Sequence, residues 1–260
     1  MIRERVLLLT KDRLVPGRVC IFKTPVSAAV PELTSLLNHT ELKRYGSYRK
    51  EEDQKRALLS FALLRLLLSQ VTGKSPGEIK ISRACPYCGK PHGKPQVLDE
   101  GPIEVNISHS GKWVLIAIAL HTPVGIDIEK RTPDRIEDEM VKRVLSTEEI
   151  KKWEKLSESE KEAAFYRYWT RKEAILKATG EGLTVPMTRL SVTHQDQSPR
   201  LIKWEGNEEK VSQIHCYPLL IDPKYEACLA VIGRCEEILL KQGEDIIQAW
   251  LTYRDVLSAR

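Results

Sequence analysis

Gly125-Ile126-Asp127-Ile128-Glu129 is the stretch from which both a fold and a site can be inferred. Apolar and acidic side chains alternate along it, which is the period of a half-buried β-strand. Ile126 and Ile128 are therefore expected to face a core, while Asp127 and Glu129 share the opposite face. Two carboxylates at positions i and i+2 lie roughly 6.5–7 Å apart along a strand. A hard divalent cation can sit between them, directly or through water.

A second segment, WTRKEAILK at residues 169–177, has the pattern of a helix. Glu173 and Lys177 are four positions apart, so they lie on one face of that helix. Three carboxylates and one lysine from a strand and a helix can together hold a magnesium-bound pyrophosphate. The alternative is structural: a solvated acidic strand face and a Glu–Lys helix pair, which stabilises a helix by only about 0.2–0.5 kcal/mol.

Hydrophobic patterning divides the rest of the chain into the elements of an α+β protein. The strongest helix, 51–71, stops at Thr72-Gly73, and a helix at 160–178 stops in the same way at Thr179-Gly180. This similarity suggests two related halves that meet near residue 121. The other expected elements are a strand-and-loop segment at 1–23, helices at 33–37, from the capping box at 146–149, and at 236–257, and strands at 79–81, 103–107, 113–120, 124–129, 213–217 and 227–232.

Composition limits the class of protein. The chain has 260 residues, of which 42% are hydrophobic and 30% charged, so it can bury a real core. Its N-terminus does not resemble a secretory signal, and its longest apolar run, 57–68, is broken by Arg65 and is too short for a bilayer. We therefore expect a cytoplasmic protein without a membrane partner.

The formal net charge of +5 suits an anionic partner. Nucleic acid is disfavoured as that partner, because the basic residues are interleaved with acids and form no stripe with aromatic residues.

Cysteine spacing raises the question of a zinc site. Cys85, Cys88 and His92 provide two thiols and an imidazole at metal-like spacing, but a structural zinc normally needs a fourth ligand and none stands nearby. The sequence therefore favours reduced thiols in a tight turn, with zinc as the open alternative.

The motifs, in their order, resemble those of the 4′-phosphopantetheinyl transferases, and most closely the larger, surfactin-synthetase-activating type. GIDIE followed by W-x-x-K-E-A-x-x-K is the main pattern. Gly93-Lys94-Pro95, the segment NISHS at 106–110 and an upstream basic helix start support it. The resemblance runs from about residue 40 to 186, and no further motif follows.

The resemblance implies two similar α+β halves related by pseudo-twofold symmetry, with the cofactor site at their interface. The first half, 1–121, would contact the cofactor nucleotide, and the second, 122–260, would hold the metal and contact the carrier protein. The implied enzyme is a Mg²⁺- or Mn²⁺-dependent monomer of nonribosomal peptide or polyketide biosynthesis. It moves 4′-phosphopantetheine from coenzyme A to a serine of an acyl or peptidyl carrier protein, converting apo to holo form and releasing 3′,5′-ADP.

The resemblance also assigns roles at the acidic site. Asp127, Glu129 and Glu173 would ligate the metal. Glu173 is the first candidate for the general base, and Glu129 competes with it. Lys177 would stabilise phosphate charge, with Lys172 as a less certain second.

Further residues are candidates for binding coenzyme A. The segment 93–95 would lie near the adenine and ribose phosphate. Ser108 and His109, expected in a turn after a strand, could donate hydrogen bonds to phosphate. Arg44 and Arg56 are candidates for the 3′-phosphate, or else belong to a solvated helix face. The cofactor-binding set is Lys94, Pro95, Ser108, His109, Lys172, Lys177, Arg44 and Arg56.

The carrier protein is expected to dock on residues 131–168, because carrier proteins are acidic and this segment links the two acidic motifs. Arg143, Lys151 and Lys152 are candidates for its basic part. Trp169 is expected in the core rather than as a binding platform.

Two other functions remain open at this stage. The same acids could serve a metal-dependent hydrolase that cleaves the coenzyme A pyrophosphate with water. A noncatalytic nucleic-acid-binding protein could instead use the Cys-x-x-Cys region.

Overall fold

A computed structural model describes residues 14–132, 136–194 and 197–258, so most of the expected segment 1–23 lies outside the described residues. The strands are β1 Arg18–Pro25, β2 Lys80–Ser82, β3 Gln96–Leu98, β4 Ile103–Ser110, β5 Trp113–Leu120, β6 Val124–Lys130, β7 Leu190–Val192, β8 Leu201–Trp204, β9 Ile214–Pro218, β10 Tyr225–Ile232 and β11 Glu237–Gln242. The α-helices are α2 His39–Ser47, α3 Glu51–Thr72, α4 Asp138–Val144, α5 Thr147–Trp153, α6 Glu158–Thr179 and α7 Gly243–Ser258. Short 3₁₀ helices lie at Val26–Ala28, Pro31–Leu36, Gly182–Thr184, Met187–Arg189 and Glu208–Gln213.

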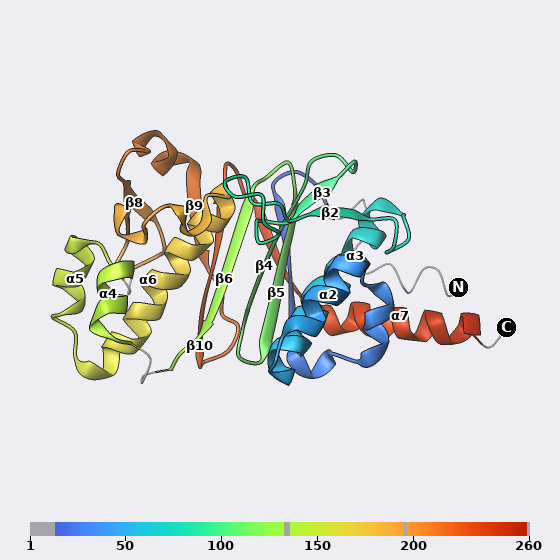
Figure 1. The fold of residues 1–260 in the computed structure, drawn as a ribbon. Coiled ribbons are helices and arrows are strands. Elements are labelled where there is room, and N and C mark those ends of the chain that lie inside the picture. The colour runs from blue at the N-terminus through green and yellow to red at the C-terminus, as the bar shows by residue number, and fades with distance from the viewer. Residues whose placement is uncertain (1–13, 133–135, 195–196, 259–260) are drawn as a thin grey trace.

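Two sheets form the centre of the molecule, and a long helix covers the outer side of each (Figure 1). The larger sheet has six strands in the order β11-β1-β5-β4-β3-β2, with α2, α3 and α7 outside it. The smaller sheet has the order β6-β10-β9, with α6 outside it. A four-layer arrangement of helix, sheet, sheet and helix follows.

The alternation of side chains along the strands builds three cores. In β5, Val114, Ile116 and Ile118 pack with the leucines of α3. The intervening positions of β5 point the other way and meet Ile126 and Ile128 of β6 between the sheets. The opposite face of the smaller sheet packs on α6. Both faces of β6 are therefore buried, and its acidic face does not lie in open solvent.

The predicted α+β class with two similar halves is confirmed. Each half has a sheet and a 22-residue outer helix, and both helices end at a glycine with left-handed backbone, Gly73 at φ 76° and Gly180 at φ 78°. A left-handed residue after the last turn satisfies the final carbonyl groups, and glycine adopts it without strain.

The last part of the chain corrects two predictions. Residues 236–257 are not one helix, because residues 237–242 form β11, which pairs in parallel with β1. The helix α7 then packs against α3. The C-terminal segment thus belongs to the first sheet, and the second half does not extend to the chain end as 122–260 supposed.

Smaller differences concern β4 and α4. The strand expected at 103–107 continues to Ser110, so Ser108 and His109 lie within β4 rather than in a turn after it. Helix α4 was not expected. None of the described helices is long and apolar enough to cross a bilayer.

Candidate functional site

The close approach of β6 and α6 creates the site. A Cβ atom at Gly125 would lie 2.0 Å from the carbonyl oxygen of Ala174, so only glycine permits this contact. The same contact encloses the acidic face of β6, and Asp127 is only 2% exposed. The alternative of a solvated acidic strand face is therefore excluded for Asp127, and Asp127 and Glu129 share one face of the strand as predicted.

Asp127 and Lys177 form the electrostatic centre of the site. The Lys177 ammonium donates to Asp127 Oδ1 at 2.6 Å, and the Ser108 hydroxyl donates to the same oxygen at 2.9 Å. Burial alone would lower the pKa of Lys177, but Asp127, Glu173 and Glu129 outweigh it and raise the pKa. Lys177 is therefore held as an ammonium ion.

Two further carboxyl groups lie beside this pair. Burial, followed by the charge of Asp127, raises the pKa of Glu129 to about 7, although the Ser110 hydroxyl donates to Glu129 Oε2 at 2.8 Å. Burial also raises the pKa of Glu173 against the opposing effect of Lys177. Three carboxyl groups thus crowd around one lysine, and the raised pKa values show that the site favours binding a proton or another cation.

The oxygen donors of this set suit a hard divalent cation in their chemistry, although the three carboxyl groups do not bring their oxygen atoms within 4.8 Å of one another in this structure. Asp127 Oδ2 is buried and has no hydrogen-bond partner among the described residues. A buried carboxylate oxygen without a partner is costly, and a cation would remove that cost. Lys177 now occupies the other oxygen of Asp127, so a cation would compete with its ammonium there. All-oxygen ligands select Mg²⁺ or Mn²⁺ rather than zinc.

The acids open into a cavity of about 300 Å³ between the two halves. An adjoining cavity of about 550 Å³ shares four of its lining residues. These shared residues are Arg83, Ile107, Glu173 and Lys177. Together the cavities form a cleft that continues from the acids to the loop between β2 and β3.

His109 lies on the cavity wall with Ser108, as the sequence suggested. Desolvation lowers the pKa of His109, and the cations of Lys177 and Arg56 act in the same direction. The imidazole is therefore neutral at pH 7 and can donate one hydrogen bond from a ring N–H.

Arg83 is a cavity residue that the sequence analysis missed. Burial, followed by the charge of Arg44, lowers the pKa of Arg83 to about 10, so it stays charged. One buried guanidinium nitrogen of Arg83 has no partner within the described chain. Arg44 and Arg83 both lie over the ring of Phe61, with distances of 6.0 and 5.2 Å to its centroid. An isolated arginine before a cysteine loop gives no sequence signal of this arrangement.

Arg56 and Lys94 are both engaged elsewhere. Arg56 pairs with Asp53 at 2.6 Å and also donates to the carbonyl oxygen of Gly111. Lys94 pairs with Glu104 at 2.9 Å and lies with Pro95 on the adjoining cavity. Lys94 therefore reaches the cleft, whereas Arg56 holds the α3 start to the β4–β5 turn.

The predicted role of Lys172 in the site is wrong. Its side chain is 0% exposed, and its ammonium donates to Glu149 and to the carbonyl oxygen of Val144. Lys172 thus fastens α6 to α4 and α5. Trp169 is only half-buried: it packs edge-on against Phe165 at 5.8 Å and also lines the cavity, so it is both core and wall.

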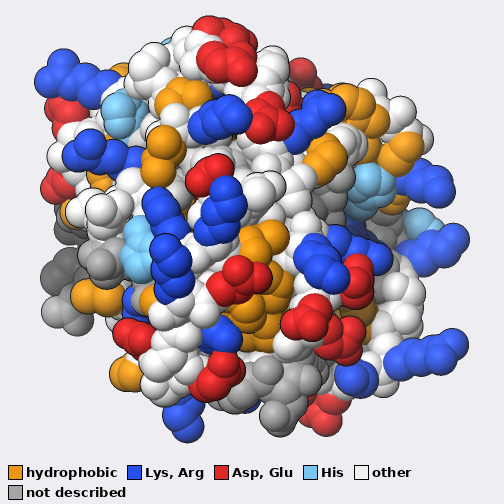
Figure 2. Space-filling model, turned by 90° about the vertical axis from the view of Figure 1, so that its left-hand side faces the viewer, with side chains coloured by type: hydrophobic (Ala, Val, Ile, Leu, Met, Phe, Trp, Pro, Cys, Tyr) orange, Lys and Arg blue, Asp and Glu red, His pale blue; other side chains and the backbone are white. Residues whose placement is uncertain are grey.

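The predicted docking residues Arg143, Lys151 and Lys152 are exposed on α4 and α5. Figure 2 shows the side of the molecule that carries these helices. Basic and acidic side chains are interleaved on it around a hydrophobic patch. The described part of this face is therefore mixed in charge rather than strongly basic.

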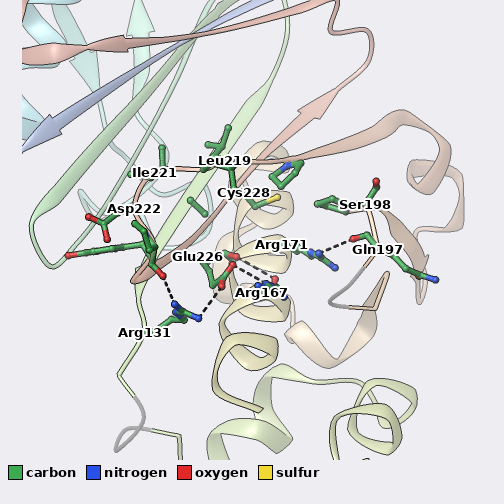
Figure 3. Close-up of a pocket in the computed structure, with 17 residues that line it drawn as sticks. Arg131, Arg167, Arg171, Gln197, Ser198, Leu219, Ile221, Asp222, Glu226 and Cys228 are labelled. Atoms are coloured by element: carbon green, nitrogen blue, oxygen red, sulfur yellow. Dashed lines mark hydrogen bonds and ion pairs between the residues drawn. The ribbon is translucent and has the colours of Figure 1, made fainter. Parts of the chain in front are cut away.

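A separate cavity of about 710 Å³ lies along α6, between it and the segments 197–199 and 218–223 (Figure 3). Its arginines are engaged within the protein. Glu226 pairs with Arg167 at 3.1 Å and with Arg131 at 3.8 Å, and Arg171 donates to backbone carbonyl groups. These contacts explain the charges of this cavity without a ligand.

Comparisons with known proteins agree with this arrangement in two halves. Residues 24–121 match the family model "4′-phosphopantetheinyl transferase, N-terminal", and residues 123–230 match the model "4′-phosphopantetheinyl transferase superfamily".

Named relatives extend this likeness over most of the chain. The 4′-phosphopantetheinyl transferase Sfp of Bacillus subtilis (strain 168) is 30% identical over 218 residues, covering 82% of this chain and 91% of the relative. Another 4′-phosphopantetheinyl transferase of Bacillus subtilis is 29% identical over 197 residues, covering 76% and 84%. A relative from Synechocystis sp. is 29% identical over 157 residues, covering 60% of this chain and 61% of its own length.

Proposed function

The chain belongs to the 4′-phosphopantetheinyl transferase superfamily, and on that premise we propose that it transfers 4′-phosphopantetheine from coenzyme A to a serine of a carrier protein. The observation that carries the proposal is the cluster of Asp127, Glu129, Glu173 and Lys177 at the junction of the halves, with Asp127 Oδ2 unpartnered among the described residues. Such a cluster suits a cation and a pyrophosphate together.

Asp127, Glu129 and Glu173 would hold Mg²⁺ or Mn²⁺. The ion would neutralise charge on the coenzyme A pyrophosphate and on the departing 3′,5′-ADP. Lys177, kept protonated by the three acids, would stabilise the same charge from the protein side. The neutral His109 would donate a hydrogen bond to a phosphate oxygen.

The reaction is a phosphoryl transfer with one bond made and one broken. The serine hydroxyl of the carrier attacks the β-phosphorus of coenzyme A, and the bond to the bridging oxygen of 3′,5′-ADP breaks. The serine proton passes to a carboxylate, for which Glu173 and Glu129 are the candidates. Both have a raised pKa, which brings them closer to the range that suits a base at neutral pH.

Arg44 and Arg83 are the cations that we assign to the 3′-phosphate, in place of Arg56. Both line the smaller cavity, and Arg83 has a buried nitrogen without a partner in the described chain. Lys94 and Pro95 would contact the nucleotide from the adjoining cavity.

Intact mass spectrometry tests the proposal. An apo acyl or peptidyl carrier protein incubated with the enzyme, Mg²⁺ and coenzyme A should gain one phosphopantetheine arm. Asp127→Asn keeps the side-chain shape but removes the charge, and should abolish the gain. Free phosphopantetheine without a modified carrier would instead indicate the hydrolase. Salt-dependent binding to DNA or RNA without coenzyme A binding would indicate the nucleic-acid-binding protein.

Steady-state kinetics separates binding from chemistry. His109→Ala removes a contact present in both the ground and transition states, so it should mainly raise KM for coenzyme A. Glu173→Gln removes charge and basicity and should mainly lower kcat. If Glu173→Gln changes KM alone, Glu173 is not the base.

We further propose a cytoplasmic monomer that docks its carrier on the segment 131–168. None of the six cysteines is paired in a disulfide, which suits a reducing compartment. Charge reversal at Arg143, Lys151 and Lys152 together should raise KM for an acidic carrier and leave KM for coenzyme A unchanged.

A further inference from the structure

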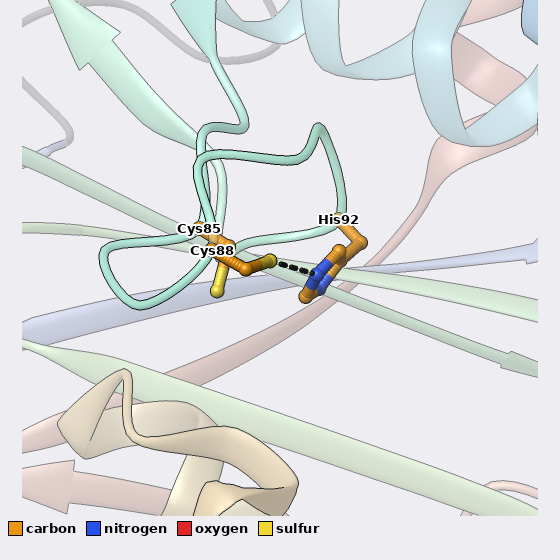
Figure 4. Close-up of side chains that lie close together, drawn as sticks. All are labelled: Cys85, Cys88 and His92. Carbon is orange, nitrogen blue, oxygen red and sulfur yellow. Dashed lines mark hydrogen bonds between the residues drawn. The ribbon is translucent and has the colours of Figure 1, made fainter.

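The loop between β2 and β3 brings Cys85, Cys88 and His92 together. One ligand atom from each residue lies within 4.8 Å of the other two, and Cys88 Sγ is 3.0 Å from His92 Nε2. In Figure 4 both sulfur atoms and the imidazole lie on the same side of the loop. The sequence shows no fourth ligand nearby. The structure nevertheless brings the ligand atoms of these three residues together.

Backbone hydrogen bonds hold the loop in this shape. The carbonyl oxygen of Cys85 accepts from the Gly89 amide, and the Cys85 amide donates to Lys90, each at 2.8 Å. Gly89 turns the chain with a positive φ of 68°. A Cβ at Gly93 would lie 2.8 Å from the carbonyl oxygen of Ala84, so the two arms of the loop touch here.

The loop has little apolar burial to maintain this shape. Tyr87 at its tip is 60% exposed, and Cys88 and His92 are also exposed. A small, closed loop without its own core is commonly stabilised by a metal or a disulfide.

We propose that Cys85, Cys88 and His92 bind one Zn²⁺ ion, with the fourth position open to water or another ligand. Two thiolates and an imidazole form a ligand set that selects zinc over magnesium. Among the described residues, these three form the one group of histidine, cysteine or carboxylate side chains close enough to do so. Two thiolates also balance the charge of the ion, so the exposed loop would carry no net charge at the site.

The position of the loop gives the ion a role. Cys85 and His92 line the adjoining cavity of about 550 Å³ together with Lys94 and Lys177. A metal at the loop would fix this wall and the Lys94-Pro95 segment that follows it. This consequence rests on the proposed function, whereas zinc binding itself does not.

Elemental analysis of the purified full chain tests the site directly. The wild type should carry one zinc per chain, and Cys85→Ser/Cys88→Ser should carry none. Cys235→Ser, outside the loop, is the matched control and should keep the zinc. Asp127→Asn should also keep it, which separates this site from the acidic one. Cobalt substitution should give the absorption of tetrahedral thiolate-bound Co²⁺, lost in the double variant.

Limited chymotrypsin digestion gives a second readout that does not depend on activity. Removal of zinc by a chelator should speed cleavage after Tyr87, which is 60% exposed at the tip of the loop, and added Zn²⁺ should restore protection. The proposal is overturned if the wild type neither contains zinc nor takes it up from micromolar solution. A Cys85–Cys88 disulfide under reducing conditions, or zinc retained by the double variant, would also overturn it.

Discussion

Glu129 combines two properties that both favour its protonated form: it lies near other carboxylates, and it is partly desolvated. Burial and Asp127 raise the pKa of Glu129 from 4.5 to about 7. The native state therefore holds this proton more tightly than the unfolded chain. Stability contributed by the group is full at low pH and is lost as pH rises from about 4.5 through about 7.

Glu129→Gln should remove this pH dependence. In the presence of a chelator, the wild type should lose stability relative to Glu129→Gln between pH 5 and pH 8. Urea unfolding at both pH values measures the difference, and Glu154→Gln on the exposed end of α5 is the control. A wild-type-minus-variant difference that does not change with pH would contradict the raised pKa. Mg²⁺ should bind more tightly over the same range, because it displaces the proton.

For individual residues of the site, spacing in the sequence predicts which side chains share a face of a strand or helix. It does not predict whether that face points into the site or into the core. Asp127 and Glu129 share a face because strands have a period of two, and Glu173 and Lys177 do because helices have a period of 3.6. Lys172 is adjacent to Glu173 in the motif, yet one step along a helix turns it into the core beside Glu149. Arg83 depends on Phe61 and Arg44, which are distant in sequence.

The contact between β6 and α6 is the element-level feature on which the site depends. Gly125 lets the strand lie against the helix backbone, where a Cβ would meet Ala174 O at 2.0 Å and Ala178 N at 2.3 Å. Neither atom belongs to a flexible side chain, so the whole helix would have to move.

Gly125→Ala should therefore destabilise the protein by about 1–3 kcal/mol or more, as overpacking does. It should also impair activity, because α6 carries Glu173 and Lys177. Gly46→Ala is the matched control: Gly46 is exposed on α2, and an added Cβ would meet nothing within 4 Å beyond its own chain neighbours and helix backbone. That change should leave stability equal or raise it by up to about 1 kcal/mol. Thermal unfolding compares the two, and equal melting temperatures would refute the close contact.

Local patterns located the elements with strong periodicity and failed where pairing partners are far apart. Helices α3 and α6 and strands β5 and β6 follow the predicted ranges closely. The apolar residues of β11 suit an amphipathic pattern and therefore predict a helix, which is wrong. The register of β11 is set by Arg18↔Glu237 and the following pairs with β1, which a local window cannot contain.

At the scale of the whole molecule, the two halves meet along β4 and β6. Strand β6 is the edge of the smaller sheet, and a buried edge needs partners for its backbone N–H groups. Side chains of β4 supply them: Ile126 N–H donates to Asn106 at 2.9 Å, Ile128 to Ser108 at 3.3 Å and Lys130 to Ser110 at 3.0 Å. The NISHS segment thus joins the halves.

The same serines also orient the acids. Ser108 and Ser110 accept from β6 amides and donate to Asp127 and Glu129. The residues of this segment predict only a role in binding the cofactor, because their hydrogen-bond partners lie in the other half of the chain. The same two serines therefore join the two halves and position the carboxylates.

Hydrogen bonds from β6 amides to Asn106, Ser108 and Ser110 form a seam between the halves. Of these three residues, Asn106 is the one whose replacement should lower the free energy of unfolding most. It is 3% exposed, so Asn106→Ala would leave the Ile126 N–H buried without an acceptor, at a cost of about 1–3 kcal/mol. Ser110→Ala is the comparison, since Ser110 is less buried and water can replace its hydroxyl at Lys130. Urea unfolding should rank Asn106→Ala as the less stable variant.

Hydrogen exchange at the Ile126 amide should accelerate in that variant, while amides within α3 exchange as they do in the wild type. Unchanged protection at Ile126 would mean that the halves are held by the apolar core between the sheets and not by this hydrogen-bonded seam.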